Sequence, residues 1–215
     1  MNKIVTLGGI LIVIGLGLVL FFSSSAPQSE WDGSNRVVML GDSITKRVNW
    51  NRMLGRSDLW NQGVDGDTTT DILARLPSIL HVRPRLCFLM AGINDISRGA
   101  ALETVKSNLA HILGALASRG IPTIVLSTLF VSDTAVEARK INRQVAGLNR
   151  WLRRTVKAGG HWFINLNETL CDGGGLKEIY TVDGIHLSTA GYQAWADVIA
   201  PLLSRESETE SPDGD

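Results

Sequence analysis

The sequence has few cysteines and no excess of charge of either sign. Its 215 residues include only Cys87 and Cys171, which are too few for a disulfide-built scaffold or a zinc cluster. Lys and Arg total 21, as do Asp and Glu, so the formal net charge is zero. A zero net charge argues against a protein whose main function is to bind nucleic acid. With 44% hydrophobic and 20% charged residues, the chain is neither intrinsically disordered nor a protein with several membrane spans. One folded domain with attached segments remains.

The longest uncharged stretch lies near the amino end, from Ile4 to Phe22. It is long enough to cross a hydrocarbon layer of about 30 Å. Lys3 precedes it and no Lys or Arg follows until Arg36, so the positive-inside rule places the amino terminus in the cytoplasm. A cleaved signal peptide is the alternative, because small residues follow at Ser23–Ala26. We expect residues 1–22 to be a membrane anchor or a signal segment. The catalytic part would then be extracytoplasmic, that is, periplasmic in a Gram-negative cell, or secreted after cleavage.

The remaining boundaries follow from composition. Residues 23–35 are short, polar and contain Pro27, which is typical of a linker. Residues 205–215 carry five acidic residues, one Arg and no large apolar side chain, so a disordered acidic tail is expected there. The folded domain is therefore predicted over residues 36–204.

Within that domain, short apolar runs alternate with longer stretches of helical period. The predicted strands are Val37–Leu40, Leu59–Asn61, Leu86–Met90, Thr123–Ser127 and Trp162–Ile164. The predicted helices are Thr45–Leu54, Thr69–Leu80, Leu102–Ser118, Ala135–Lys157 and Thr189–Leu203. This alternation predicts an α/β fold in which a five-stranded parallel sheet lies between two layers of helices, with the active site at the carboxyl ends of the strands.

Two short motifs could form a nucleophile and its base. Gly41-Asp42-Ser43 directly follows the first predicted strand, so Ser43 would lie at a strand end, either as an exposed nucleophile or simply as a helix cap. Asp183 lies three residues before His186, just ahead of the last helix. An acid at that spacing can hold one ring nitrogen of the histidine while the other faces a serine.

An ester hydrolase also needs hydrogen-bond donors for the oxyanion of its tetrahedral intermediate. Gly66, in the loop after the second strand, could offer its backbone N–H without an obstructing side chain. Asn94, in the loop after the third strand, has a neutral amide donor. Asp42 and Asp95 stand beside these motifs, and we interpret both as stabilising loops.

Together these four blocks resemble the SGNH hydrolases, the superfamily of the GDSL-type esterases and lipases. The resemblance covers Val37–Leu203 and implies a flavodoxin-like fold without metal or cofactor. It implies Ser43 as nucleophile, His186 as base and Asp183 as its orienting acid, with the Ser43 and Gly66 backbone N–H groups and Asn94 as oxyanion donors. Ile44 stands where many members have leucine. A broader likeness points to the compact branch that resembles platelet-activating-factor acetylhydrolase subunits and bacterial lysophospholipase-like esterases.

The substrate is less constrained than the chemistry. Few residues separate the blocks, which favours a shallow cleft and a short acyl group such as acetyl. We expect an acetyl esterase acting on acetylated carbohydrate near the membrane. Lysophospholipid or thioester hydrolysis is the alternative, as is an acyltransferase that modifies an envelope polysaccharide. A catalytically inactive binding module is disfavoured because all the motif residues are present. The sequence leaves the oligomeric state open.

One charge pattern stands apart from the motifs. Seven basic residues and no acidic one lie between Arg139 and Lys157. Apolar residues of the same helix form a stripe, whereas most of these basic residues cluster on the other side. The pattern is typical of a solvated face, or else of attraction to anionic lipid headgroups or an acidic polymer. Cys87 is expected to be buried, and its pairing with Cys171 is left open.

Overall fold

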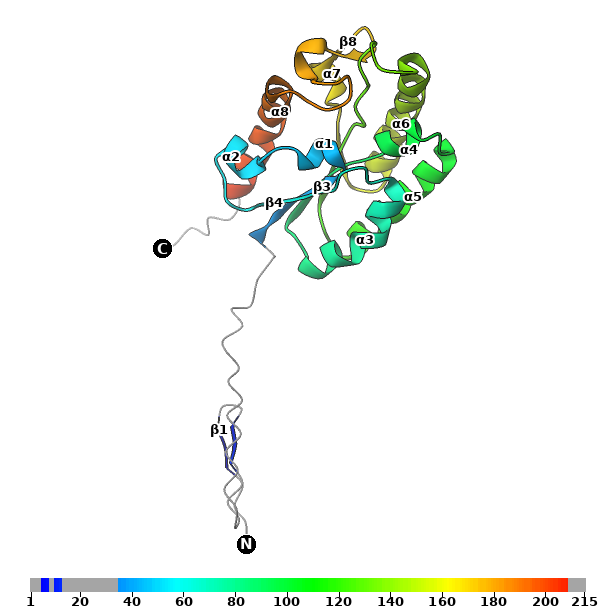
Figure 1. Ribbon diagram of the computed structural model, residues 1–215. Coiled ribbons are helices and arrows are strands. Elements are labelled where there is room, and N and C mark those ends of the chain that lie inside the picture. Colours follow the sequence, from blue (N-terminus) through cyan, green and yellow to red (C-terminus); the bar gives the residue numbers. More distant parts are fainter. Residues whose placement is uncertain (1–4, 8–9, 13–34, 209–215) are drawn as a thin grey trace. The chain divides into compact units, whose positions relative to one another are not determined.

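The computed structural model describes residues 5–7, 10–12 and 35–208 (Figure 1). Five parallel strands form one sheet in the order β4-β3-β5-β6-β7. They are β3 (Val37–Gly41), β4 (Leu59–Gly63), β5 (Leu86–Met90), β6 (Thr123–Leu126) and β7 (Trp162–Ile164). The predicted five-stranded parallel sheet is thus confirmed. The chain leaves β3 for β4 on one side and returns to β5 on the other, which is the switch point where sheets of this kind bind ligands.

The central strands are apolar along their whole length. β3 and β5 are buried at every position, because a parallel sheet with helices on both faces exposes neither side of its central strands. β7 lies at the edge of the sheet and is only partly buried; Trp162 at its start is 58% exposed.

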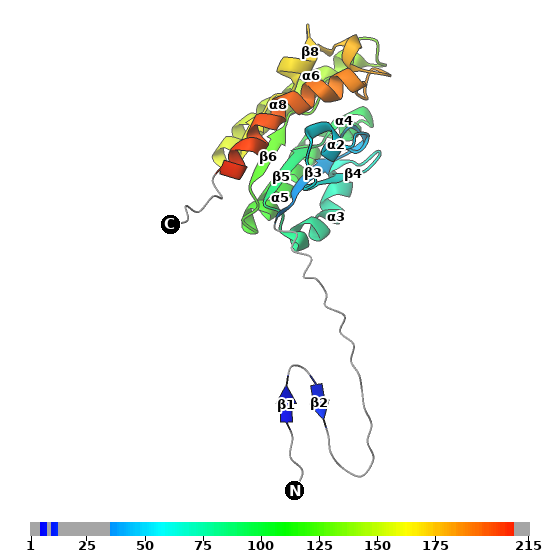
Figure 2. The same cartoon turned by 90° about the vertical axis from the view of Figure 1, so that its left-hand side faces the viewer.

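Two groups of helices cover the sheet. α3 (Thr69–Val82), α5 (Leu102–Ser118) and α6 (Ala138–Ala158) pack in sequence on one face, whereas α2 (Trp50–Leu54) packs with α8 (Thr189–Glu208). In Figure 1, α2 and α8 lie on one side of the strands and α3, α5 and α6 on the other, which gives three layers; in Figure 2, α8 faces the viewer. Short helices complete the loops at the carboxyl ends of the strands: α1 (Ser43–Lys46), α4 (Ile93–Ser97) and α7 (Asn167–Leu170).

The helix predicted over Thr45–Leu54 is in fact two helices, α1 and α2. The Asn61 side chain donates to the backbone carbonyls of Thr45, Lys46 and Val48 at 3.2, 3.1 and 3.0 Å. A continuous helix would have used such carbonyls internally. The Asn49 side chain then caps α2 by accepting from the Arg52 N–H at 3.0 Å.

Other boundaries also differ from the prediction. α6 begins at Ala138 rather than Ala135, because Glu137 has a left-handed backbone (φ 56°). α4 replaces part of a predicted loop, and α8 ends at Glu208, beyond the predicted end at Leu203. A small hairpin of β8 (Cys171–Asp172) and β9 (Gly175–Leu176), followed by the 3₁₀ turn Glu178–Tyr180, has no counterpart in the prediction.

The amino-terminal segment forms a separate unit over residues 1–32. Its described residues are two short antiparallel strands, β1 (Val5–Leu7) and β2 (Ile10–Ile12). These residues are therefore extended where the sequence predicts part of a membrane helix, and their β-branched side chains favour that backbone; the rest of Ile4–Phe22 lies outside the described residues. No helix among the described residues is both long and apolar enough to cross a membrane.

An aromatic cluster joins α2 to α8 within the core. The rings of Trp50 and Trp195 lie 4.6 Å apart between centroids, and Tyr192 lies 6.2 Å from Trp50. All three are buried, so Tyr192 and Trp195 are core residues. Cys87 is buried in β5, and both it and Cys171 are free thiols, so the disulfide that the sequence left open is not formed.

Candidate active site

Ser43 is the first residue of α1, immediately beyond the end of β3. The turn that precedes it is tight: a Cβ at Gly41 would meet Thr45 Oγ1 and, at 2.6 Å, the Met90 carbonyl oxygen, so only glycine fits there. The preceding Asp42 caps α1 by accepting from the Ile44 N–H at 2.9 Å. Ser43 is 6% exposed, so the short turn between β3 and α1 holds it in a nearly buried position.

Asp42 is the most strongly perturbed carboxyl group beside Ser43. Its side chain is buried, and its Oδ2 has no hydrogen-bond partner among the described residues. Burial raises the pKa of Asp42 to about 7, against the opposing effect of the Ile44 N–H, and the negative charges of Asp67 and Asp95 act in the same direction as burial. The capping geometry agrees with the interpretation of Asp42 as a residue that stabilises the turn.

This raised pKa predicts a pH-dependent stability. The folded state binds the Asp42 proton more tightly than the unfolded state. The protonated carboxyl therefore contributes to the stability of the fold, and this stabilisation is fully present below about pH 4 and is lost as the pH rises through about 7. The Asp42→Asn variant cannot ionise, so its free energy of unfolding relative to the parent should increase over that range, by up to about 4 kcal/mol. Urea unfolding at several pH values measures the difference. For the control Asp197→Asn, at an exposed position, the difference in free energy of unfolding from the parent should not change with pH. A difference that does not change with pH for Asp42→Asn would contradict the prediction.

His186 reaches Ser43 from the opposite end of the chain. Its Nε2 lies 2.9 Å from Ser43 Oγ, and its Nδ1 lies 2.6 Å from Asp183 Oδ2. The other oxygen of Asp183 accepts from the backbone N–H groups of Ile185 and His186 at 3.0 and 2.7 Å. The structure thus brings together all three residues that the sequence predicted for this group.

A compact turn holds the Asp183–His186 segment. Thr181 and Leu187 form an isolated antiparallel β-bridge across the turn. The Thr181 Oγ1 donates to the His186 carbonyl at 2.8 Å and accepts from the Gly184 N–H at 2.8 Å. Gly184 has φ 87°, a backbone conformation that favours glycine. These contacts fix the path of the backbone, and the contact of Nδ1 with Asp183 orients the imidazole ring.

Asp183 is ionised under ordinary conditions. Burial alone would raise its pKa, but the hydrogen bonds from the His186 backbone and ring and from the Ile185 backbone outweigh it and lower the pKa to about 2. A charged carboxylate at Nδ1 favours the tautomer in which Nδ1 carries the proton and Nε2 is free to accept one. The arrangement can therefore take a proton from Ser43 Oγ and stabilise the imidazolium that results.

The two other predicted residues form a second cluster. Gly66 lies in the loop after β4 with φ 76°, and Asn94 lies in α4 after β5. The Asn94 amide donates to the Asp67 carbonyl at 2.9 Å, so this amide is tied to the Gly66 loop. A Cβ at Gly66 would stand 3.1 Å from Arg98 Nη2. In the described part of the chain, no hydrogen bond joins this cluster directly to Ser43 Oγ.

The supporting hydrogen bonds of three residues were not predicted from the sequence. Arg75 pairs with Asp67 at 2.7 Å and donates from Nη2 to the carbonyls of Gly41 and Gln62 at 3.0 and 2.9 Å. The Tyr192 hydroxyl donates to the Ile44 carbonyl at 2.8 Å, which fastens α1 to α8. Asn108 on α5 donates to the Thr69 and Thr70 hydroxyls. These contacts join segments that are distant in the sequence, so no local motif predicts them.

Asp95 also has a structural role, as expected. Its two oxygens accept from the backbone N–H and the hydroxyl of Thr69 at 2.9 and 2.7 Å, which holds the start of α3 against α4. Among the described side chains, no group of three or more His, Cys, Asp or Glu residues is placed to hold a metal ion.

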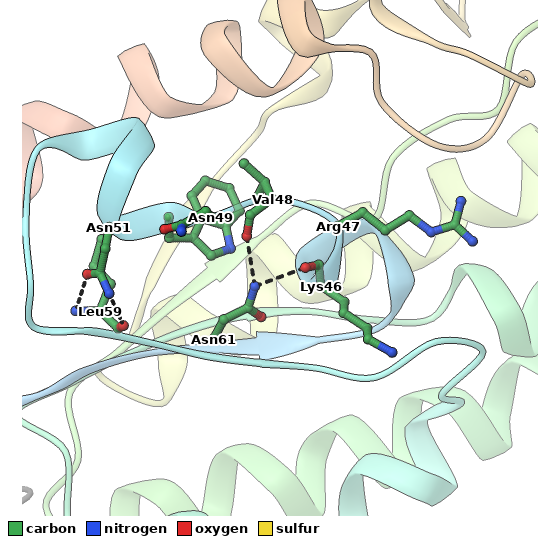
Figure 3. Close-up of a pocket in the computed structure, with 8 residues that line it drawn as sticks. Lys46, Arg47, Val48, Asn49, Asn51, Leu59 and Asn61 are labelled. Carbon is green, nitrogen blue, oxygen red and sulfur yellow. Dashed lines mark hydrogen bonds between the residues drawn. The ribbon is translucent and has the colours of Figure 1, made fainter.

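A hollow of about 540 Å³ lies beside α1 (Figure 3). Its polar walls are largely committed to the fold. The Asn51 side chain bonds the backbone of Leu59 in both directions, and Asn61 holds the carbonyls between α1 and α2. Lys46 and Arg47 pair with Asp65 at 2.7 and 3.6 Å. Ser43 is not among the lining residues, so this hollow is not the candidate active site.

The chain is similar to two kinds of curated protein. N-acylneuraminate cytidylyltransferase of Streptococcus agalactiae serotype III is 26% identical over 175 residues, which is 77% of this chain and 40% of that one. Arylesterase of Vibrio mimicus is 30% identical over 126 residues, which is 52% of this chain and 62% of that one. The chain therefore spans less than two thirds of the length of these relatives.

Solved structures share the fold. A candidate platelet activating factor from Streptococcus pneumonia superposes with a TM-score of 0.71 at 27% identity, covering 79% of this chain and 84% of that one. A mutant of Axe2, an acetyl-xylooligosaccharide esterase from Geobacillus Stearmophilus, gives 0.66 at 19% identity, covering 79% and 93%. Residues 39–194 match the model of the GDSL-like Lipase/Acylhydrolase family. This match spans all of the site residues described above, and the chain therefore belongs to the GDSL-like lipase/acylhydrolase family.

Proposed function

We propose that the protein is a serine-dependent carboxylic ester hydrolase. The observation that carries the proposal is the chain of contacts from Ser43 Oγ through the His186 ring to Asp183. His186 Nε2 takes the Ser43 proton as Oγ bonds to the ester carbonyl carbon, and it returns that proton to the departing alcohol. Water then attacks the acyl-serine while His186 again accepts a proton, which releases the acid and restores Ser43.

Oxyanion stabilisation is assigned to three donors. The backbone N–H of Ser43 takes part in no described hydrogen bond, and it lies on the residue that is attacked. The Asn94 amide has one N–H engaged by the Asp67 carbonyl, which leaves a second for the substrate. Gly66 contributes its backbone N–H from the same loop as Asp67. Donors fixed before the reaction are worth more than mobile ones, because they need no reorganisation as charge develops.

The proposed substrate is a short-acyl ester, most simply an acetyl group on carbohydrate. Two similar proteins support this choice by their names: one is an acetyl-xylooligosaccharide esterase, and another is an arylesterase. The cytidylyltransferase relative acts, by its name, on an acylated sugar acid. The short segments between the site blocks add support, since they leave little chain for a large lid.

A series of p-nitrophenyl esters tests this choice. We expect kcat/KM to be highest for acetate and to fall with butyrate and octanoate, because a shallow site gives a longer chain no added contact. Acetylated oligosaccharides, assayed for released acetate, should be hydrolysed as well. Preference for octanoate or longer chains would contradict the short-acyl proposal. An acylated acceptor among the products would instead identify an acyltransferase.

A second candidate rests on exposed apolar side chains near the His186 turn. Ile179 and Val182 are 70% and 68% exposed, and both precede Asp183 closely in the chain. Val136 is 87% exposed, on the loop whose Ala135 Cβ lies 3.5 Å from a Cβ built on Gly184. Exposed apolar groups at this rim suit an acyl chain or lipid aggregate, so lysophospholipid or thioester hydrolysis is the alternative.

We also propose that the domain is held outside the cytoplasm by its amino-terminal segment. The uncharged run from Ile4 to Phe22, with Lys3 before it, supports an anchor or a signal segment. Cell fractionation of the full chain distinguishes the two: an anchored protein stays with membranes after a carbonate wash, whereas a cleaved one is found in the soluble extracytoplasmic fraction.

A further inference from the structure

A groove runs along α6 beside the loop that follows β6. One hollow of about 570 Å³ is bordered by Arg139 and Arg143 on α6 and by Gly173 and Gly174 of the small hairpin. A second, of about 210 Å³, is bordered by Arg150 and Arg153. Both hollows are lined by Phe130 and Ala146, so they are neighbours along α6, and we call them together the α6 groove. In Figure 1, α6 and β8 lie near one another at the carboxyl end of the sheet.

The arginines form a row because of their spacing on the helix. Positions 139, 143, 146 and 150 differ by three, four or seven residues, so they share one side of α6. From Arg139 to Arg150 the row is about 17 Å long at about 1.5 Å per residue. The small side chain of Ala146 lies between the charges and leaves the hollow open.

The positive charge of this row is not neutralised within the fold. Arg139, Arg143 and Arg150 are exposed and form no ion pair in the part of the chain that the structure describes. Arg153 pairs with Glu168 at 3.3 Å and lies over the Phe163 ring at 5.5 Å. One acid, Asp133, also lines the groove, so the groove is basic on balance.

The other polar groups of the groove are already bonded. The Asn142 amide donates to the carbonyls of Val131 and Gly174 at 2.9 and 3.0 Å, and its oxygen accepts from the Val131 N–H. Asn149 bonds the backbone of Thr128 in both directions. The guanidinium groups and the Phe130 ring are therefore what the groove offers to a ligand, and that combination fits acidic groups on a chain with apolar faces.

The loop of residues 130–137 joins the α6 groove to the catalytic turn. One side of this loop lines the groove through Phe130 and Asp133. Its other side contacts the His186 turn, since the Ser132 N–H donates to the Gly184 carbonyl at 2.8 Å. A single loop therefore separates the groove from the His186 turn.

We infer that the α6 groove binds the acid groups of an anionic polysaccharide whose ester is presented to Ser43. This inference rests on the proposed esterase function and names its substrate class: an acidic carbohydrate rather than a neutral one. A polymer is favoured over a bilayer because the arginines border a hollow that a flat membrane surface does not enter. The row of charges, about 17 Å long, also suits several successive acid groups.

The test compares acidic and neutral polymers in charge-reversed proteins. In the full chain, Arg143→Glu combined with Arg150→Glu reverses two charges of the groove. Arg52→Glu combined with Arg119→Glu makes the same change in net charge at exposed positions outside it. The readouts are kcat/KM on acetylated polygalacturonate, on acetylated glucomannan and on p-nitrophenyl acetate, together with binding of unesterified polygalacturonate.

We expect the groove variant to lose about tenfold in kcat/KM on acetylated polygalacturonate and a similar factor in polygalacturonate binding. Its activity on the two neutral substrates should match the parent, as should all activities of the control variant. An equal loss on glucomannan, no loss on polygalacturonate, or charge-dependent binding to phosphatidylglycerol vesicles in place of the polymer would overturn the inference. Failure of the parent on p-nitrophenyl acetate would instead count against the proposed esterase, because polymer binding is measured without the reaction.

Discussion

Replacing Ser43 with alanine is expected to lower kcat for p-nitrophenyl acetate by on the order of 10⁵- to 10⁶-fold. The hydroxyl that His186 contacts at 2.9 Å is the atom that would form the acyl-enzyme, and alanine has no group to replace it. Only oxyanion stabilisation and binding would remain, which sustain a small residual rate. Steady-state kinetics on matched preparations measure the effect.

Ser97→Ala is the matched control for this substitution. Ser97 is exposed at the end of α4, and its side chain forms no hydrogen bond among those described. Its kcat should equal that of the parent. The far-ultraviolet circular dichroism of both variants should also be unchanged, because the Ser43 side chain contributes little core area. Retention of more than a hundredth of the parental rate in Ser43→Ala would mean that another residue is the nucleophile.

Replacing Asp183 with asparagine is expected to lower kcat by about 10³- to 10⁴-fold. Asparagine can still accept from the Ile185 and His186 backbone with its oxygen. Its amide, however, presents N–H groups to Nδ1 where Asp183 Oδ2 accepted at 2.6 Å. The histidine would then hold its proton on Nε2, facing Ser43, and could no longer act as the base. The variant should remain folded, since the backbone contacts of the turn persist.

The pH profile provides a second readout for Asp183. The pKa of Asp183 is lowered to about 2, so the parent should show no activity loss from protonation of this carboxyl above about pH 3.

Asp172→Asn, a substitution at an exposed position in the β8–β9 hairpin, is the control for Asp183→Asn and should leave kcat unchanged. If Asp183→Asn lost less than tenfold, a different acid would have to orient His186.

The sheet and the central group of three residues could be predicted from the sequence for a common physical reason. Buried parallel strands must be apolar at every position, so runs such as Leu86–Met90 are visible without any context. Ser43 begins α1 and His186 lies three residues before α8, and both are close to glycines that the turn requires. Local sequence therefore carries enough information to position them.

What the sequence did not predict depends on contacts between distant residues. The division of α1 from α2 comes from Asn61, a side chain on the neighbouring strand. The brace from Arg75 to Gly41 spans 34 positions of the chain. One wall of the larger hollow of the α6 groove is the Gly173–Gly174 turn, which folds back to Asn142. A pattern of basic residues predicts a charged helix face, but it does not predict the wall opposite.

The separation of the reacting pair along the chain has a consequence for biosynthesis. Ser43 and His186 lie 143 positions apart, and the Tyr192 hydroxyl that fastens α1 comes from the last helix. A ribosome-bound chain therefore carries its nucleophile for most of translation without a base to activate it. If the domain is the proposed esterase, it becomes active only after the final helix has emerged and docked, because both His186 and the Tyr192 contact to α1 are made late in translation.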